Sequence, residues 1–229
     1  MKRQDLYFAI VMLAIFLPFF LSADLYDWYK TFNADHAMIM AFLKFGILAT
    51  LGEMLGCRIS TGNYTTPTFG VAPRMVIWGI LGVAIAMAMM VFKSGIPAFI
   101  AAMGGAELVA DFAAGGFSWG KLVVALSISV MMNTFFAPVF MTFHKITDTH
   151  IAENGGSIKA LFKPIPMRRL ITTLNWDRQW SFIFKKTIPL FWYPAHTITF
   201  MLPGEYQVLF AALLGVALGV ILAIGARKK

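Results

Sequence analysis

The sequence predicts an all-α fold, a polytopic transmembrane helix bundle with six spans and one re-entrant or interfacial segment. Hydrophobic residues make up 59% of the 229 residues and charged residues only 13%, which is about half the charged share of a soluble domain. The apolar runs are long and continuous, without the alternation of a barrel strand. A chain inside lipid satisfies its backbone groups by forming helices. We therefore expect residues 1–229 to form a single transmembrane domain.

The expected spans follow the apolar runs in order. The first, at residues 6–21, is preceded by Lys2 and Arg3. These flanks also fit a cleaved secretory signal, but the run is longer than most signal cores, which favours a retained span. The run at 187–202 contains Pro189 and Pro194 and barely reaches the length that a bilayer core requires. The other spans are expected at residues 37–56, 75–92, 122–143 and 206–225.

The distribution of Lys and Arg predicts the orientation. If the N-terminus is cytoplasmic, six spans place most of the 19 basic residues and both termini on the cytoplasmic side, as the positive-inside rule requires. The basic segment 144–180 then forms a cytoplasmic loop that contacts anionic headgroups of the bilayer. The net charge of +8 therefore indicates topology, and we expect no nucleic-acid partner.

Residues 96–114 form the ambiguous segment, because they are apolar but contain Gly104, Gly105, Glu107 and Asp111. A true span here would invert every later loop and move residues 144–180 to the translocated side. The segment is therefore predicted to be re-entrant or interfacial on the outer face. Irregular backbone at membrane depth is tolerated where protein or a watery cavity covers it, so this segment is a candidate gate.

Lys44 is the most unusual residue, since it lies about 12 Å along its expected span, near the bilayer midplane. A charge at that depth must face the bundle and find a partner. Asn133 and His196 fall in the same layer, so we predict a polar midplane cluster of Lys44, Asn133 and His196. Glu107 and Asp111, four residues apart, are predicted to cap it from outside as an acidic gate. The alternative is a set of purely structural hydrogen bonds between helices.

A second polar layer is expected near the cytoplasmic side. There Glu53 and Arg74 are placed to form an inner ion pair, which we interpret as a brace. His144, Asp148 and His150 have a spacing that suits a metal ion such as Zn²⁺, although a helix exit at the headgroups also explains them. Catalytic motifs of phosphate-binding, serine-hydrolase and metalloprotease types are lacking from the sequence. We therefore expect no enzyme activity, no cofactor and no bound metal.

Small residues indicate close helix contacts. Gly52 and Gly56 form one small-xxx-small pattern and Gly215 and Gly219 form another. Self-association through the last helix, and hence a homo-oligomer, stays open. Cys57 is the only cysteine, so neither an intrachain disulfide nor a cysteine-based metal site can form.

Residues 37–223 contain several short motifs, which are Gly46 to Gly52-Glu53, Arg74-Met75 with Gly79, Asn133 with Ala137-Pro138, and Trp192, Pro194, Phe200 and Pro203. Together these motifs resemble the Mpv/PMP family of small peroxisomal and mitochondrial inner-membrane proteins. Gln207 stands where that family usually has Arg.

The resemblance implies a bacterial relative of that family, located in the inner (plasma) membrane. It also implies a channel-like role without naming a solute. We therefore predict an integral membrane channel or transporter for small solutes or ions. The alternatives are a non-transporting scaffold or assembly partner and, less favoured, a membrane-embedded metal-dependent lipid enzyme.

Overall fold

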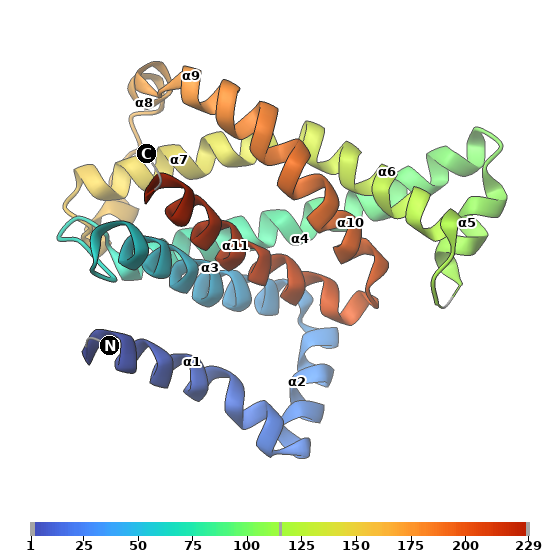
Figure 1. Cartoon of the computed structure of the whole chain (residues 1–229), viewed down its shortest axis with the longest axis horizontal. Helices are drawn as coiled ribbons and strands as arrows, with labels where there is room; N and C mark the ends of the chain where they lie inside the picture. Colours follow the sequence, from blue (N-terminus) through green and yellow to red (C-terminus); the bar gives the residue numbers. More distant parts are fainter. Residues whose placement is uncertain (1–2, 115, 228–229) are drawn as a thin grey trace.

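The computed structural model describes residues 3–114 and 116–227, and within these ranges every regular element is a helix (Figure 1). The predicted all-α class is therefore confirmed. The longer helices are α1 (Arg3–Leu21), α2 (Ala23–Asp35), α3 (Ala37–Thr61), α4 (Val71–Ala102), α6 (Trp119–Phe135), α7 (Ala137–Glu153), η2 (Gln179–Trp192) and α11 (Gly204–Arg227). The shorter ones are α5 (Ala106–Ala113), η1 (Ile158–Phe162), α8 (Met167–Thr173), α9 (Trp176–Arg178) and α10 (Tyr193–Met201).

Helices of membrane length indicate a membrane protein. In the described residues, α1, α3, α4 and the 204–221 part of α11 are long and apolar enough to cross a bilayer. The pair α6 and α7 adds a fifth if its two bent halves form one span. Six spans are not confirmed, because the helical stretch at 179–201, which covers most of the expected span at 187–202, is not among these candidates.

The expected span at 122–143 is bent by 46° where α6 meets α7. Pro138 lies in the first turn of α7. Its ring cannot donate a backbone hydrogen bond and clashes with the preceding turn, so a straight helix cannot continue through this point. The bend changes the direction of α7 relative to α6.

Two segments have different boundaries in the structure from those predicted from the sequence. Residues 96–102 are the last turns of α4, which runs through Pro97, and only the short α5 follows as a separate helix. The chain reverses at Gly104, whose φ of 93° favours glycine. Residues 144–153 continue α7, so they belong to a helix and the loop predicted at 144–180 begins only after Glu153.

The packing of α3 against α4 and α11 forms the centre of the bundle. A Cβ atom at Gly52 would lie 2.8 Å from Cα of Val216, and one at Gly46 would lie 2.8 Å from the carbonyl oxygen of Met75. These glycines therefore allow close backbone approach, as small residues do between membrane helices. Gly215 differs, since a Cβ there would meet no atom within 4 Å.

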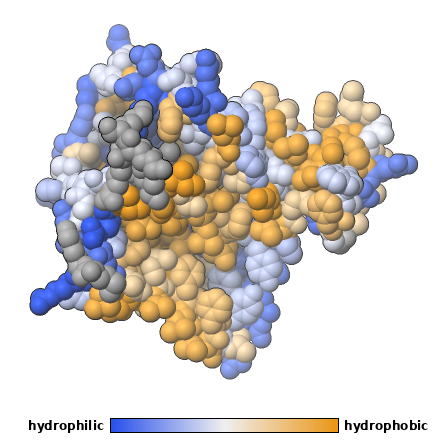
Figure 2. Space-filling model, in the orientation of Figure 1, coloured by the Kyte–Doolittle hydropathy of each residue, from blue (hydrophilic) through white to orange (hydrophobic). Residues whose placement is uncertain are grey.

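The two ends of the molecule differ in their elements. Figure 1 shows the start of α1, the end of α11 and helix α8 at one end, and α5 at the other. Figure 2 shows hydrophobic residues across the centre of the visible face and hydrophilic residues gathered at the end that carries α8. This is the pattern expected of a bundle whose middle faces lipid.

Candidate functional site

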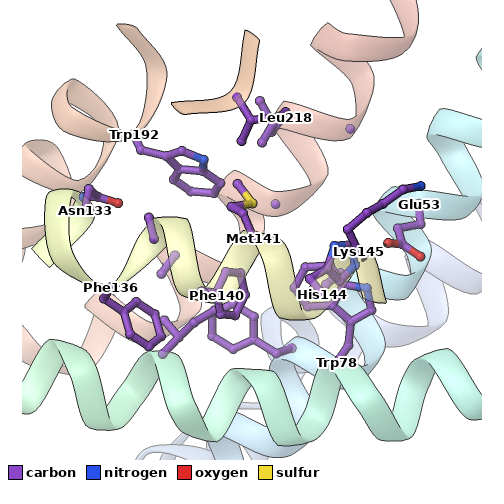
Figure 3. Close-up of a pocket in the computed structure, with 18 of the residues that line it drawn as sticks. Glu53, Trp78, Asn133, Phe136, Phe140, Met141, His144, Lys145, Trp192 and Leu218 are labelled. Atoms are coloured by element: carbon purple, nitrogen blue, oxygen red, sulfur yellow. Dashed lines mark hydrogen bonds and ion pairs between the residues drawn. The ribbon is translucent and has the colours of Figure 1, made fainter. Parts of the chain in front are cut away.

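A cavity of about 420 Å³ lies between the helices, lined by residues of α3, α4, α6, α7, η2, α10 and α11 (Figure 3). Its volume falls in the range of about 300–1,000 Å³ that is usual for small-molecule sites. Most of its lining is apolar and includes Phe45, Trp78, Phe136, Phe140, Trp192 and Leu218. Its polar lining residues are Glu53, Ser60, Asn133, His144, Lys145, Gln179 and His196.

An ionic cluster occupies one end of the cavity. Arg74 of α4 forms ion pairs with Glu53 of α3 and with Asp148 of α7, and its Nε donates a hydrogen bond of 2.6 Å to the carbonyl oxygen of Phe69. His144, one turn before Asp148, places Nε2 3.0 Å from Oε1 of Glu53. The structure thus brings together the predicted pair Glu53 and Arg74 and adds two residues of α7. Three helices are tied together by groups that satisfy one another.

The same cluster contains a set of possible metal ligands. Glu53, His144 and Asp148 each offer one ligand atom, and these atoms lie within 4.8 Å of one another. The guanidinium of Arg74 contacts both carboxylates, so it already supplies the positive charge that a metal ion would bring. A cation could bind there only after Arg74 moved away.

His150 does not join these ligands. Its Nε2 lies 3.0 Å from the carbonyl oxygen of Ala160, on the side of η1. The predicted trio His144, Asp148 and His150 is therefore not brought together, because His150 is six residues after His144 and projects from another face of α7. Glu53, from a distant helix, takes the third position.

Asn133 and His196 form a second polar pair in the lining of the cavity. Nδ1 of His196 lies 3.1 Å from Oδ1 and 3.0 Å from Nδ2 of Asn133, so either tautomer of the imidazole keeps the pair hydrogen-bonded. Asn133 also donates to the carbonyl oxygen of Ser129 at 2.8 Å. The indole of Trp192 stacks on His196 with ring centroids 5.0 Å apart. The predicted proximity of Asn133 and His196 is present in the structure.

Lys44 does not belong to that pair. Its side chain is buried, with 6% exposed, and its ammonium donates a hydrogen bond to Asn33 and lies 5.2 Å from the ring centroid of Tyr29. Both partners belong to α2, which leads into the start of α3 (Figure 1). A long lysine side chain can reach toward the end of its helix in this way. The predicted cluster of three residues is thus reduced to two.

The predicted outer gate lies away from the cavity. Glu107 and Asp111 are exposed residues of α5, beyond the end of the bundle (Figure 1), and neither contributes to the cavity lining. A Cβ atom at Gly120 would lie 2.3 Å from Oδ2 of Asp111, so Asp111 packs against the first turn of α6. A carboxylate there interacts favourably with the helix dipole.

Sequence reasoning missed three residues of the cavity as functional candidates: Trp78, Gln179 and Trp192. In each, a buried side-chain nitrogen has no hydrogen-bond partner. Trp192 appeared only as part of a family motif, and Gln179 lies in the segment predicted to be a cytoplasmic loop. No periodic pattern in the sequence distinguishes these residues from ordinary core residues. They are identified only by their unpartnered nitrogens in the structure.

No protein family model, curated protein or solved structure matches this chain. The resemblance to the Mpv/PMP family therefore stays a prediction, and the site's own geometry carries the functional argument.

Proposed function

We propose that this protein is a membrane channel or transporter for small solutes or ions, and that the central cavity is its solute site. The observation that carries this proposal is a cavity of about 420 Å³ between helices of membrane length, with an ionic cluster at one end and a polar pair elsewhere in its lining. Ionisable residues at membrane depth usually mark pathways for ions or substrates.

The wall formed by η2 and α10 supports a transport role because it can change shape. The N–H of Tyr193 donates to the carbonyl oxygen of Ile188, five residues back, and the wide turns of η2 contain Pro189. Pro194 follows in the first turn of α10. Such π-helical turns and proline breaks weaken the helical hydrogen-bond ladder and occur often at functional sites. Movement of this wall would open and close the cavity.

The proposed orientation places the end with α8 in the cytoplasm of a bacterial cell, with the protein in the inner membrane. The start of α1 and the end of α11 lie at this same end (Figure 1), together with the basic residues Arg168, Arg169 and Arg178 of α8 and α9. This arrangement agrees with a positive-inside topology and with contact between the basic segment and anionic headgroups.

A metal-dependent lipid enzyme is a second candidate, favoured by the approach of Glu53, His144 and Asp148. Arg74 opposes it by pairing with both carboxylates. Elemental analysis of the purified protein separates the two functions. Stoichiometric zinc, lost together with activity in His144→Ala, would favour the enzyme, whereas flux without bound metal favours transport.

Flux through reconstituted liposomes tests the proposal. Vesicles are loaded with potassium ions, sucrose and carboxyfluorescein, which represent an ion, a neutral polar solute and an aromatic carboxylate. We expect release of at least one solute at ten or more times the rate of protein-free vesicles. Folded protein that releases none of them would favour the scaffold alternative.

A pair of glycine substitutions provides the matched control. Gly215 lines the cavity and a Cβ atom there meets open space, so Gly215→Leu should fill the cavity and reduce flux to the background rate. Gly95 of α4 is exposed and equally free of neighbours, so Gly95→Leu makes the same chemical change outside the cavity and should leave flux unchanged. Equal flux in the two variants would contradict the assignment of the cavity as the solute site.

A further inference from the structure

A second cavity, which we call the α1 groove, lies between α1 and α3. It has a volume of about 410 Å³ and is bounded by one face of α1, by α3 and by the chain that follows α3. The residues of α1 that line it are three or four positions apart, which places them on one side of a helix; they are Gln4, Tyr7, Phe8 and Val11. The other lining residues are Leu51, Met54, Asn63, Tyr64 and Thr65. None of these residues lines the central cavity, so the α1 groove is a separate site.

Helix α1 is of membrane length but does not pack closely on the bundle. Within Arg3–Leu21, which the structure describes throughout, no residue is buried, and the backbone of α1 packs mainly on α2. Figure 1 shows α1 running beside α3, with α2 joining the two helices at one end. At the other end side chains make the link, since Arg58 of α3 pairs with Asp5 at 2.7 Å and the rings of Phe8 and Tyr64 stack with centroids 4.6 Å apart. The protein therefore fixes the groove at both ends.

The middle of the α1 groove calls for an apolar molecule from outside the chain. Its wall there is formed by Val11, Leu51 and Met54, and a buried water molecule needs about two to four polar partners, which these side chains do not offer. An empty gap is also unfavourable, because the atoms along it lose their dispersion contacts. Tyr7 and Val11 line the groove while 64% and 45% exposed, so the groove is open to the surrounding lipid. A hydrocarbon chain of the bilayer matches these surroundings.

The end of the groove at the start of α1 has a different chemistry. Gln4, Asn63 and Thr65 line it and carry amide and hydroxyl groups that can donate hydrogen bonds to oxygen. Arg3 and Asp5 flank Gln4 in the sequence, and Arg58 pairs with Asp5, so these three charged residues leave one net positive charge. An apolar middle and a positive, hydrogen-bonding end together match an amphiphile with an anionic head group.

The size of the α1 groove decides between a lipid and a helix from a second copy of the chain. A single turn of an α-helix, about 10 Å wide and 5.4 Å long, takes up roughly 420 Å³. The groove therefore has room for about one turn, whereas a membrane-spanning helix has about five. An acyl chain is narrower than a helix and flexible enough to lie along the groove.

We propose that the α1 groove binds one phospholipid with an anionic head group, taken from the leaflet on the side of α8. An acyl chain lies between α1 and α3, against Val11 and Met54. The phosphate and ester oxygens accept hydrogen bonds from Gln4, Asn63 and Thr65. The bound lipid fills the gap that separates α1 from the bundle. This site goes beyond the proposed transport function and does not depend on it.

Native mass spectrometry of the purified chain in detergent tests the proposal. The protein is titrated with phosphatidylglycerol and, in parallel, with a diacyl trimethylammonium-propane lipid that has the same acyl chains and a cationic head. We expect one phosphatidylglycerol to bind saturably to each chain, with an affinity roughly fivefold or more above that of the cationic lipid. Unsaturable adducts, or equal affinity for the two lipids, would overturn the proposal. Dimers that form in place of the lipid adduct would also overturn it, because a second copy would then cover the groove.

Two tryptophan substitutions on α1 locate the bound lipid. Val11→Trp fills the groove and should lower the affinity for phosphatidylglycerol roughly fivefold or more. Ile10→Trp is the matched control, because Ile10 is 50% exposed and lies outside the lining. This control should bind like the wild type. Equal affinity in the two folded variants would contradict the location of the site.

Two further variants test the head-group end. Arg3→Gln removes a positive charge beside Gln4 and should lower the affinity for phosphatidylglycerol roughly fivefold. Arg168→Gln removes a positive charge from α8, away from the groove, and should leave this affinity unchanged. An equal loss in both variants would mean that overall charge attracts the lipid, which contradicts a head-group site at the start of α1.

A photoreactive lipid gives a result that does not depend on any variant. Phosphatidylglycerol with a diazirine on its acyl chain is irradiated with the wild-type protein in phosphatidylcholine nanodiscs, and the labelled peptides are mapped. We expect labels at Val11 and Met54 that unlabelled phosphatidylglycerol prevents. Labels that resist competition, or that lie only on other faces of α1, would refute the site.

Discussion

The ionic cluster reaches the cavity through Glu53 and His144, and a second group of lining residues, Trp78, Gln179 and Trp192, differs from it in how its polar atoms are satisfied. Around Arg74, the carboxylates of Glu53 and Asp148 and the imidazole of His144 find partners within the protein. The side-chain nitrogens of Trp78, Gln179 and Trp192 have no hydrogen-bond partner. Both groups of residues lie in mostly apolar surroundings, so burial alone does not explain why one group has partners and the other has none.

This contrast separates polar residues that hold the helices together from those whose side-chain nitrogens have no partner. The cluster joins α3, α4 and α7, and its removal should affect the stability of the bundle. The unpartnered nitrogens form no hydrogen bond between helices, so their removal should not destabilise the bundle. Substitutions in the two regions should therefore change the free energy of unfolding in opposite directions.

The largest effect is expected at Arg74. Arg74→Met removes the guanidinium that pairs with both Glu53 and Asp148, leaving two carboxylates close together in a mostly buried site. Breaking such a buried pair typically costs about 3–5 kcal/mol. We expect a marked fall in the thermal unfolding midpoint in detergent, measured by differential scanning fluorimetry.

Arg169→Met provides the control for this substitution, because Arg169 forms an ion pair with Glu153 in which its side chain is 52% exposed. Exposed pairs contribute about 1 kcal/mol or less. Equal loss of stability in the two arginine variants would show that the cluster does not brace the bundle.

A smaller loss is expected at His196. In His196→Phe the ring can still stack with Trp192, but Asn133, which is 2% exposed, loses one hydrogen-bond partner. Leaving a buried polar group unpaired costs about 1–3 kcal/mol. The unfolding midpoint should fall, though less than in Arg74→Met. The double variant His196→Phe/Asn133→Leu should recover part of the loss, and no recovery would contradict a pairing role.

Apolar patterning was sufficient to predict helices of membrane length and the approach of some distant residues. Glu53 and Arg74 were expected to pair because a short connection joins their helices, and the structure contains that pair. Asn133 and His196 were matched by depth along their helices, and they are hydrogen-bonded. Depth and sequence distance are properties that an apolar pattern encodes directly.

The direction in which a side chain projects was not predictable in the same way. Lys44 lies at the expected position in its helix, yet it pairs with Asn33 because α2 is a helix beside the start of α3. Asp148 joins Arg74 because α7 packs against α4. Both outcomes depend on tertiary packing, which a hydropathy profile does not contain.

The opposite sign is expected at Gln179. Gln179→Leu removes a buried amide nitrogen that has no partner and keeps a side chain of similar size. Replacing an unsatisfied polar group by an apolar one is neutral or stabilising, so the unfolding free energy of the ligand-free protein should rise by up to about 1 kcal/mol. A rise in the unfolding midpoint would sharpen the contrast with Arg74. A clear fall in stability would mean that this amide has a structural partner.

The smallest effect is expected at Lys44, which tests whether a buried charge must belong to the transport site. Lys44→Met keeps most of the aliphatic stem, and Asn33, which loses its donor, is only partly buried and can find another. Stability should therefore change by less than about 1 kcal/mol. Flux should stay at the wild-type rate, because Lys44 does not line the cavity, whereas Gly215→Leu in the same assay should abolish it. A tenfold loss of flux in folded Lys44→Met would mean that the conduction path runs along α2 and that the cavity is not the solute site.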